Sequence, residues 1–304
     1  MTGTLAAHHS LENHLMNSET SLNLENKIAI VSAAGRGIGK GIAKTLAAAG
    51  ATVVVNSYSE DTTQETVDEI QAKGGTAKAM PGDITEPEKI LDVVDTTLAE
   101  FGQIDILVNN VGAGPKSTDQ PPDHPLGPVE GLWNALYKQN LLPVVLMTEA
   151  VVPHMQSRRY GKIINISSIA GRSSFSAQML RNFVPPSYGA MKAALVSYTQ
   201  TLADMLGPDN INVNAVCPGI VYTDSWKGNA ERAVKAIPEF KGLDAREWFE
   251  GIFRDDYPLI FDRTPLQREQ TVEDIGNAVK FLVSDESLNI TGQSLMVDGG
   301  MVKL

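Results

Sequence analysis

Short apolar runs alternate with amphipathic helical segments from residue 27 onwards. Runs such as Ile28–Ser32 and Thr52–Asn56 are apolar on both faces, as strands are when helices cover both sides of a sheet. Strands that alternate with helices favour a doubly wound parallel sheet, because each parallel pair needs a helical crossover. No internal repeat and no second zone of composition interrupts the pattern, so the sequence predicts one α/β domain over residues 27–304.

The predicted sheet has about seven strands, each bounded by turn residues. The strand candidates are Ile28–Ser32, Thr52–Asn56, Ala77–Met80, Ile106–Asn109, Ile163–Ser167, Ile211–Val216 and Ser294–Val297. The helix candidates are Ile38–Ala49, Thr62–Lys73, Pro87–Phe101, Tyr188–Leu206 and Val272–Ser284.

Charge and cysteine content exclude several classes of protein. The 25 Lys and Arg residues against 36 Asp and Glu residues give a net charge of −11, which argues against nucleic acid as a partner. Cys217 is the only cysteine, so there is no internal disulfide or multi-cysteine metal site, and we expect no metal. No run approaches the roughly 20 apolar residues of a membrane helix, so we expect no membrane partner.

Residues 1–26 are polar, precede any periodic pattern and include His8, His9 and His14. A metal site there is one interpretation, but we favour a flexible tail, because chain ends are commonly unpacked. The segment lacks the basic start and the apolar run of a signal peptide, which predicts a cytoplasmic protein.

A glycine-rich turn, Gly35-Arg36-Gly37-Ile38-Gly39, joins the first predicted strand to the first helix. Glycines let the backbone approach a pyrophosphate, and the start of a helix offers free N–H groups to it. The common G-x-G-x-x-G pattern is not met, because Lys40 stands where its last glycine would be. The turn by itself leaves open both dinucleotide binding and a plain turn without a ligand.

The turn matches a different fingerprint, T-G-x-x-x-G-x-G, with Ser32 for the threonine and Ala33 for the first glycine. Further motifs follow in order: Gly82-Asp83-Ile84-Thr85, Asn109-Asn110-Val111-Gly112, Lys138-Gln139-Asn140-Leu141, Ile166–Gly171, Tyr188–Lys192, Pro218–Thr223, and Thr291-Gly292 with Val297–Gly300. On these motifs the chain resembles the short-chain dehydrogenase/reductase family and is similar to its 3-oxoacyl-reductase-like members. The resemblance implies a Rossmann-type fold and an oxidoreductase that acts on CH–OH or C=O groups with a nicotinamide dinucleotide.

The resemblance also implies which residues contact the dinucleotide. We expect these contacts from Ser32, Gly35, Arg36, Gly37, Ile38, Gly39, Asn56, Ser57, Asp83, Ile84, Asn110, Val111, Gly112, Tyr188, Lys192, Pro218, Gly219, Val221 and Thr223.

Four residues match the family's catalytic set, namely Ser168, Tyr188, Lys192 and Asn140. Tyr188 would donate or accept the proton, and Ser168 would orient the substrate oxygen. A free phenol titrates near 10, and a nearby cation lowers that value; Lys192 lies one helical turn further on. Asn140 would hold a water that joins Lys192 to solvent. Taken singly, each residue also has an ordinary structural interpretation, such as a cap or an amphipathic pair.

The interval between Ser168 and Tyr188 is longer than the family usually has, and the extra residues fall in Arg172–Ser187. The Pro185-Pro186 pair is expected to reset the chain so that Tyr188 enters its helix correctly.

The residue that ends the second strand decides between NAD and NADP in such proteins, and an acidic residue there holds the ribose of NAD. We assign this position to Asn56, beside Ser57, where no carboxylate repels a 2′-phosphate. Arg36 matches the basic position that NADP-selecting family members often carry. We therefore predict NADP(H) as the preferred cofactor, with NAD(H) as the alternative.

Three long connections, 112–131, 172–187 and 224–264, follow strands at the carboxyl edge, where ligands bind. The last is predicted to be a helical lid, and it contains the aromatic residues Trp226, Phe240, Trp248, Phe249, Phe253, Tyr257 and Phe261. These rings either line a hydrophobic pocket or pack the lid onto the body or onto another subunit, and both interpretations stay open. The first predicts a small-molecule substrate, a secondary alcohol or ketone with an apolar or cyclic body.

Two alternatives remain for the function. One is a 3-oxoacyl thioester reductase, whose acidic carrier would meet Arg158, Arg159, Arg172 and Arg181. The other is a dinucleotide-binding sensor that has lost catalysis. A Ser-His-Asp hydrolase is disfavoured, because the chain has no G-x-S-x-G. The family resemblance further implies a homotetramer, or else a homodimer.

Overall fold

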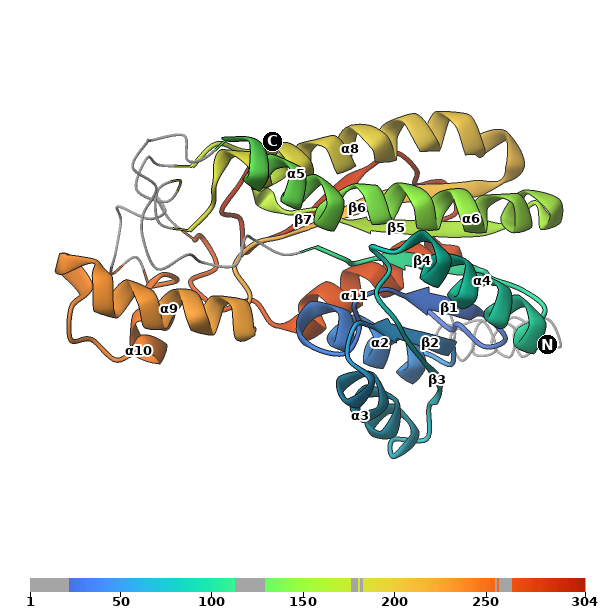
Figure 1. The fold of residues 1–304 in the computed structure, drawn as a ribbon, viewed down its shortest axis with the longest axis horizontal. Coiled ribbons are helices and arrows are strands. Elements are labelled where there is room, and N and C mark those ends of the chain that lie inside the picture. Colours follow the sequence, from blue (N-terminus) through green and yellow to red (C-terminus); the bar gives the residue numbers. More distant parts are fainter. Residues whose placement is uncertain are drawn as a thin grey trace, which may run out of the picture.

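The computed structural model describes residues 22–112, 129–175, 180, 183–254, 256 and 264–303. Its centre is a sheet of seven parallel strands in the order β3-β2-β1-β4-β5-β6-β7 (Figure 1). The strands are β1 Ile28–Val31, β2 Thr52–Ser57, β3 Thr76–Pro81, β4 Ile106–Asn109, β5 Gly161–Ile166, β6 Ile211–Pro218 and β7 Ser294–Val297. The predicted doubly wound fold is confirmed, and the strand candidates differ from these bounds only at their ends.

Helices cover both faces of the sheet (Figure 1). One face carries α2 Gly37–Ala48, α3 Glu60–Gln71 and α11 Val272–Val283. The other carries α4 Pro87–Phe101, α6 Leu142–Arg158 and α8 Pro186–Leu206, with α5 Val129–Asn140 leading into α6. The strand β2 shows why both faces are apolar, since Val53 and Val55 pack into one core and Val54 into the other.

The helix ends follow from local chemistry. Ser59 caps α3 by accepting a hydrogen bond from the N–H of Thr62, and Thr271 and Asp274 form a capping box at α11. Gly102 ends α4 with φ +74°, a left-handed conformation that glycine adopts easily. The helices α5 and α6 are not among the sequence candidates; several apolar residues of α6 are half-buried as well as buried, so its helical periodicity is weak.

The chain packs against the body earlier than the sequence suggests. Leu24 is buried, and its N–H donates a hydrogen bond of 2.7 Å to the carbonyl oxygen of Ala49. Leu24 therefore packs against the body although the sequence assigned it to the tail, because a single apolar side chain in a polar run gives no periodic signal. Residues 1–21 lie outside the described part of the chain.

The described part of the predicted lid contains the α-helices α9 Asp224–Ala236 and α10 Ala245–Gly251, which extend beyond the carboxyl edge of the sheet (Figure 1). They share a small core of their own, in which Trp248, Phe249 and Phe253 are almost fully buried. Each such ring contributes roughly 1.5–3 kcal/mol by leaving water. The lid is therefore held together by its own apolar side chains.

No helix in the described part of the chain combines the length and the apolar character that crossing a membrane requires. No three His, Cys, Asp or Glu side chains in that part of the chain come together in a way that could hold a metal ion.

Lys162, on β5, is a buried cation far from the lid. Its side chain is 1% exposed, and its Nζ donates a hydrogen bond of 2.9 Å to Oδ1 of Asn212. Burial lowers the pKa of Lys162 to about 8; the carboxylate of Asp285 opposes this shift and the charge of Lys27 adds to it. The neutral amine is therefore favoured by the fold.

This burial predicts a pH-dependent stability. Between pH 8 and pH 10.5 the unfolded chain holds a proton on Lys162 that the folded chain has released, so the free energy of unfolding rises with pH across that window. The contribution amounts to about 3 kcal/mol at most. Lys162→Met should remove this rise in urea titrations taken at a series of pH values, with the exposed Lys73→Met as the control. An unchanged pH dependence in Lys162→Met would contradict the assignment.

Candidate active site

The carboxyl ends of β1 and β4 mark the point where the strand order reverses. The chain leaves β1 towards β2 and β3, and it returns on the other side of β1 as β4. In open parallel sheets this is where ligands bind. The lid lies at the same edge (Figure 1), and the predicted site residues lie on the loops that leave the strands there and on α5 and α8.

The glycine-rich turn between β1 and α2 is tightly folded. Gly37 has φ +55°, and Ala33 has φ +50° where the family fingerprint has glycine. A Cβ on Gly35 would lie 2.6 Å from the Thr62 hydroxyl and 2.7 Å from the Ser57 hydroxyl, so the turn packs directly onto the end of β2 and the start of α3. Only glycine allows this approach.

The turn is fastened to β4 by side chains that the sequence assigns to the dinucleotide. The Ser32 hydroxyl accepts hydrogen bonds from the N–H groups of Asn110, at 3.0 Å, and Val111, at 3.2 Å. The Asn110 amide donates to the carbonyl oxygens of Ser32 and Ala33, both at 3.1 Å. Since these groups bond to one another, Ser32 and Asn110 shape the site through the backbone.

Asn56 points away from the turn. Its side chain is 1% exposed, and its amide donates to the carbonyl oxygens of Met80, at 2.9 Å, and Gly82, at 3.2 Å. The assignment of Asn56 to the ribose position therefore needs correction, because successive strand residues face opposite sides. Ser57, the next residue, is the one whose hydroxyl faces Gly35.

Arg36 is exposed at the start of α2 and makes no capping bond to that helix. Its guanidinium lies 3.7 Å from Oδ2 of Asp224, the first residue of the lid helix α9. Both side chains are more than three-quarters exposed, so this pair contributes little to stability. The N–H groups that open α2 face the site with no acidic residue in the first turn.

Asp83 and Ile84 follow β3 at the far side of the turn. The Asp83 carboxylate accepts hydrogen bonds from the N–H of Thr85, at 2.9 Å, and from its hydroxyl, at 2.7 Å. Ile84 is buried and packs into the core under α4. The local bonds fix the carboxylate at the edge of the sheet, where the resemblance expects it beside the adenine ring.

Tyr188 and Ser168 meet at the opposite end of the site. Pro185 is the N-cap of α8 and Pro186 its first residue, so the expected role of the proline pair agrees with the structure and Tyr188 lies in the first turn. The Tyr188 hydroxyl is hydrogen-bonded to the Ser168 side chain. The preceding residue, Ser167, instead donates to the carbonyl oxygen of Lys192 at 2.8 Å.

Lys192 lies one turn further along α8 and shares the face of Tyr188. Its Nζ is 5.7 Å from the centre of the Tyr188 ring and donates a hydrogen bond of 3.0 Å to the carbonyl oxygen of Ile166. Burial lowers the pKa of Lys192 to about 8, and the Cys217 thiol opposes this shift. The side chain is 3% exposed, so the amine is held inside the protein.

The pKa of Tyr188 differs from the sequence expectation. Burial raises it to about 12, while the hydrogen bond with Ser168 acts in the opposite direction. We expected the cation of Lys192 to lower this pKa, but the loss of hydration is the largest cause, and Ser168 is the group that opposes it. Tyr188 is therefore protonated at neutral pH.

Asn140 and Gly112 complete this end of the site. Asn140 is the last residue of α5 and fully buried, and its amide donates to the carbonyl oxygen of Leu136 at 3.2 Å. A Cβ on Gly112, which has φ +132°, would lie 2.5 Å from Oδ1 of Asn140 and 3.1 Å from Nζ of Lys192. The loop after β4 thus passes directly over the buried amine and amide.

The segment Pro218–Thr223 leaves β6 between these two ends. The Thr223 side chain would be 3.3 Å from a Cβ on Gly37, so this segment borders the glycine-rich turn. Val221 is buried and pairs with Gln270 in an isolated parallel bridge. Nothing in the sequence indicated this bridge or the role of the residues that precede α11.

The aromatic residues of the lid face one another. Phe183 stacks on Trp226 and on Trp248, each with ring centres 5.8 Å apart, and Phe249 contacts Tyr222 at 4.7 Å. Of the two interpretations left open by the sequence, packing of the lid is the one that these rings support. Tyr257 and Phe261 lie outside the described residues.

Two of the arginines proposed as a carrier entrance, Arg158 and Arg159, lie at the edge of the sheet opposite the site. Arg158 forms an ion pair of 2.9 Å with Asp105, whose carboxylate accepts from the N–H at the start of β1. Arg159 adjoins Asp209 at the same amino edge, opposite the site. Arg172 is described and half-buried, and Arg181 is outside the described residues. The entrance proposal fails for Arg158 and Arg159, because the length of α6 carries them to the far edge.

The residues of this edge fit a nicotinamide dinucleotide. The turn 33–39 offers close backbone approach and the unblocked start of α2, which suit a pyrophosphate. Gly112 brings the backbone of the loop after β4 so close to Lys192 and Asn140 that a side chain there would collide with them. Ser57 and Arg36 would hold the adenosine end, and Lys192 and the segment 218–223 the nicotinamide end.

Comparison with known proteins agrees with this geometry. Residues 27–233 match the family described as short chain dehydrogenase, and residues 249–302 match that described as Enoyl-(Acyl carrier protein) reductase. The chain is 34% identical over 280 residues to 3-oxoacyl-[acyl-carrier-protein] reductase FabG of Escherichia coli, covering 92% of this chain and 99% of the relative.

Solved structures resemble the whole chain. A 7 alpha-hydroxysteroid dehydrogenase complexed with NADH and 7-oxo glycochenodeoxycholic acid has a TM-score of 0.75 and 34% identity, over 94% of this chain and 98% of that one. L-sorbose reductase from Gluconobacter frateurii, complexed with NADPH and L-sorbose, has a TM-score of 0.79 and 27% identity, over 93% and 99%.

Gly112 provides a test of the site geometry. Gly112→Ala should lower kcat/KM by about two orders of magnitude, the cost of a displacement of roughly 1 Å in a catalytic group, because its Cβ collides with Asn140 and crowds Lys192. Gly102→Ala is the matched control: its φ is +74°, and nothing lies within 4 Å of the added Cβ. Equal losses in the two variants would show that backbone strain alone explains the effect.

Proposed function

The chain belongs to the short-chain dehydrogenase/reductase family, and from this we propose that it interconverts a secondary alcohol and a ketone with NADP(H) as the preferred cofactor. It is an oxidoreductase that acts on CH–OH or C=O groups with a nicotinamide dinucleotide. The observation that carries the proposed chemistry is the contact of Tyr188 with Ser168, one helical turn from the buried Lys192.

The chemistry divides between the cofactor and the chain. When bound, the nicotinamide ring supplies the hydride for reduction or accepts it in oxidation. Ser168 and Tyr188 would both hydrogen-bond to the substrate oxygen, and so place the carbonyl carbon at the nicotinamide end of the site. As negative charge develops on that oxygen, Tyr188 donates its proton and Ser168 stabilises the charge.

Lys192 and Asn140 would then restore the proton. Lys192 in its ammonium form stabilises the phenolate of Tyr188, and Asn140 would hold a water through which a proton returns from solvent. The close approach of Gly112 to both Asn140 and Lys192 supports this role, because it places the amide and the amine side by side. A Tyr188 that is protonated at neutral pH is ready to act as an acid, which suits ketone reduction.

The choice of NADP(H) rests on two features. Ser57 places a neutral hydroxyl, and no carboxylate, beside the turn at Gly35. Arg36 is exposed at the same turn, and its only described ionic partner is the weak contact with Asp224, so its guanidinium can turn to a 2′-phosphate. NAD(H) remains the alternative.

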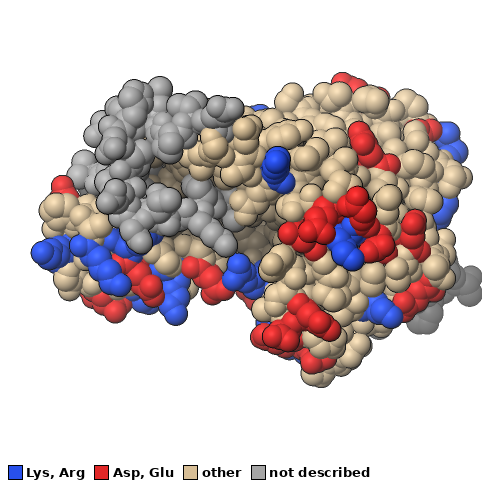
Figure 2. Space-filling model, viewed as in Figure 1, with Lys and Arg blue, Asp and Glu red and all other residues tan. Residues whose placement is uncertain are grey.

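An apolar or cyclic ketone remains our proposed substrate class. Support comes from relatives: one solved neighbour contains a steroid acid, although another contains L-sorbose. The lid aromatics no longer support the proposal, since they pack on one another. Two observations bear on the acyl-thioester alternative in opposite directions. Arg158 and Arg159 lie at the edge of the sheet opposite the site, where they cannot receive a carrier. The lid, however, presents Lys and Arg side chains among acidic ones (Figure 2).

The assembly state and the location stay predictions. Trp133 and Tyr137 of α5 are large side chains that remain 37% and 41% exposed in one chain. Such side chains suit a contact with a second copy, in line with the proposed homotetramer or homodimer. A cytoplasmic location rests on the sequence alone.

Tyr188→Phe tests the proton donor. The variant should lower kcat for ketone reduction by about 10²–10⁴-fold, the usual contribution of general acid catalysis, while NADPH binding is retained. Tyr198→Phe removes a hydroxyl from the same helix away from the site and is the control. Turnover that survives Tyr188→Phe would contradict the mechanism, and binding without any turnover in the unaltered chain would support the sensor alternative.

Arg36→Ala tests the cofactor preference. The KM for NADPH should rise far more than the KM for NADH, because only NADPH carries the 2′-phosphate that a guanidinium recognises. Asp224→Asn removes the competing carboxylate and should leave NADPH binding unchanged or tighter. Equal changes in both KM values for Arg36→Ala would refute the assignment.

A further inference from the structure

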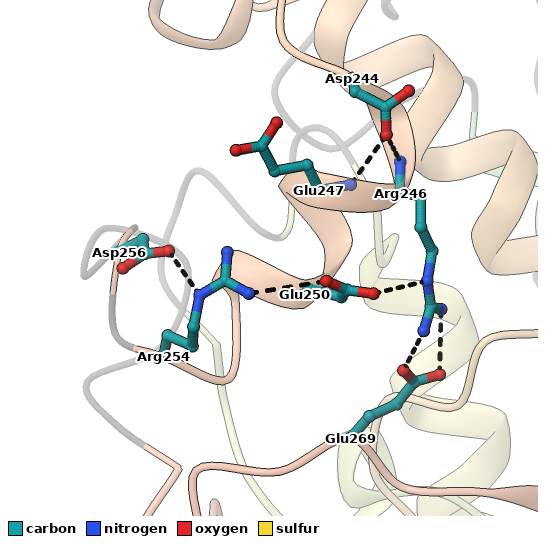
Figure 3. A network of polar contacts seen from close by, with 7 residues as sticks. All are labelled: Asp244, Arg246, Glu247, Glu250, Arg254, Asp256 and Glu269. Carbon is teal, nitrogen blue, oxygen red and sulfur yellow. Dashed lines mark hydrogen bonds and ion pairs between the residues drawn. The ribbon is translucent and has the colours of Figure 1, made fainter.

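Arg246 of α10 joins the lid to the segment that precedes α11. Its guanidinium forms two bonds with the Glu269 carboxylate, NH1 to Oε1 at 3.1 Å and NH2 to Oε2 at 2.5 Å. Its Nε also donates to Oε1 of Glu250 at 2.9 Å (Figure 3). A bidentate pair of this kind fixes the orientation of the guanidinium as well as its distance from the carboxylate. The pKa of Arg246 is raised, and the hydrogen bond with Glu269 is the main cause.

The same guanidinium lies over an aromatic ring of the segment that leaves β6. Its Cζ is 4.3 Å from the centre of the Tyr222 ring and 5.6 Å from that of Phe249. Tyr222 and Phe249 are themselves in contact, with ring centres 4.7 Å apart. Tyr222 is thus held between the lid core and a cation whose position Glu269 fixes.

Gln270, the residue after Glu269, contacts the segment that leaves β6 from the other side. Gln270 pairs with Val221 through the isolated bridge, and a Cβ on Gly219 would collide with the Gln270 side chain. Gln270 is 4% exposed, and neither its Oε1 nor its Nε2 has a hydrogen-bond partner among the described residues. Residues 219–223 are therefore bounded by Arg246 above Tyr222 and by Gln270 beside Gly219 and Val221.

We propose that Arg246 and Glu269 form a clamp that positions residues 219–223, and through them the nicotinamide half of the dinucleotide. This inference rests on the proposed function, which places that half beside the segment 218–223. Arg246 and Glu269 are positioning residues, because they act through Tyr222 and Gln270 and do not reach the reacting atoms.

The lid does not need this clamp for its own packing. Trp248, Phe249 and Phe253 form its core, and Asp244 caps α10 by accepting from two N–H groups. Arg254 makes a comparable surface network, with Glu250 at 3.6 Å and Asp256 at 3.1 Å, but it touches neither Glu269 nor an aromatic ring in the described structure (Figure 3). Arg254 is therefore the natural control, since it has the same charge and shares Glu250.

The test compares two ligands by titration calorimetry on the full chain. NADPH reports on the whole site, and adenosine 2′,5′-bisphosphate reports on the adenosine end alone. Arg246→Ala and Glu269→Gln should each weaken NADPH binding by about tenfold while changing the fragment little, because only the nicotinamide end loses its support. Arg246→Lys should also weaken NADPH binding, because an ammonium keeps the charge but cannot pair with Glu269 in two-pronged fashion. Arg254→Ala should match the unaltered chain with both ligands.

The double variant Arg246→Ala/Glu269→Gln should be no weaker than either single variant, since both remove one clamp. The proposal would be overturned if the losses of NADPH affinity in the two single variants added in the double variant. It would also be overturned if NADPH and the adenosine fragment were weakened equally. Either result would indicate a general structural role. Variants indistinguishable from Arg254→Ala would overturn it as well, while the proposed function stands. An unaltered chain that binds neither ligand would instead refute the proposed function and the clamp with it.

Discussion

Ser32 and Asn110 bond to each other across the point where the strand order reverses, and the site depends on this contact. The hydroxyl of Ser32 receives the N–H groups of two successive β4-loop residues, and the Asn110 amide returns two bonds to the turn after β1. These bonds fix the glycine-rich turn on one side. On the other side they direct the chain at Gly112 over Lys192 and Asn140. The two ends of a dinucleotide site are thereby set by one buried junction.

Burial then decides the protonation states at the reacting end. Lys192 and Tyr188 lie close together, yet their pKa values move towards the neutral forms, to about 8 and about 12. Loss of hydration outweighs attraction, because the ammonium lies beside the ring and bonds to the Ile166 carbonyl. Tyr188, protonated and hydrogen-bonded to Ser168, is therefore able to donate a proton.

Much of the fold, and the placement of Tyr188 and Lys192 together, could be predicted because the sequence patterns that indicate them are local. Apolar runs gave the strands, the four-residue spacing placed Tyr188 and Lys192 on one face, and Pro185 and Pro186 marked the start of α8. Side-chain direction could not be predicted at Asn56, where one residue along a strand reverses the face. Nor could composition tell whether lid aromatics face a ligand or one another. Arg246 and Glu269 are 23 residues apart with no periodic relation, so only the folded chain reveals their contact.

The central claim is that this chain moves a hydride between a nicotinamide dinucleotide and a carbonyl carbon while Tyr188 supplies the proton. The most direct measurement is mass spectrometry of the alcohol formed from a ketone in ordinary water with NADPH deuterated at C4 of the nicotinamide, each C4 epimer in turn. We expect alcohol that carries one deuterium, on the carbinol carbon, from one epimer only, with the hydroxyl proton drawn from water. Alcohol without deuterium from either epimer, or no alcohol from any ketone of a broad panel, would contradict it.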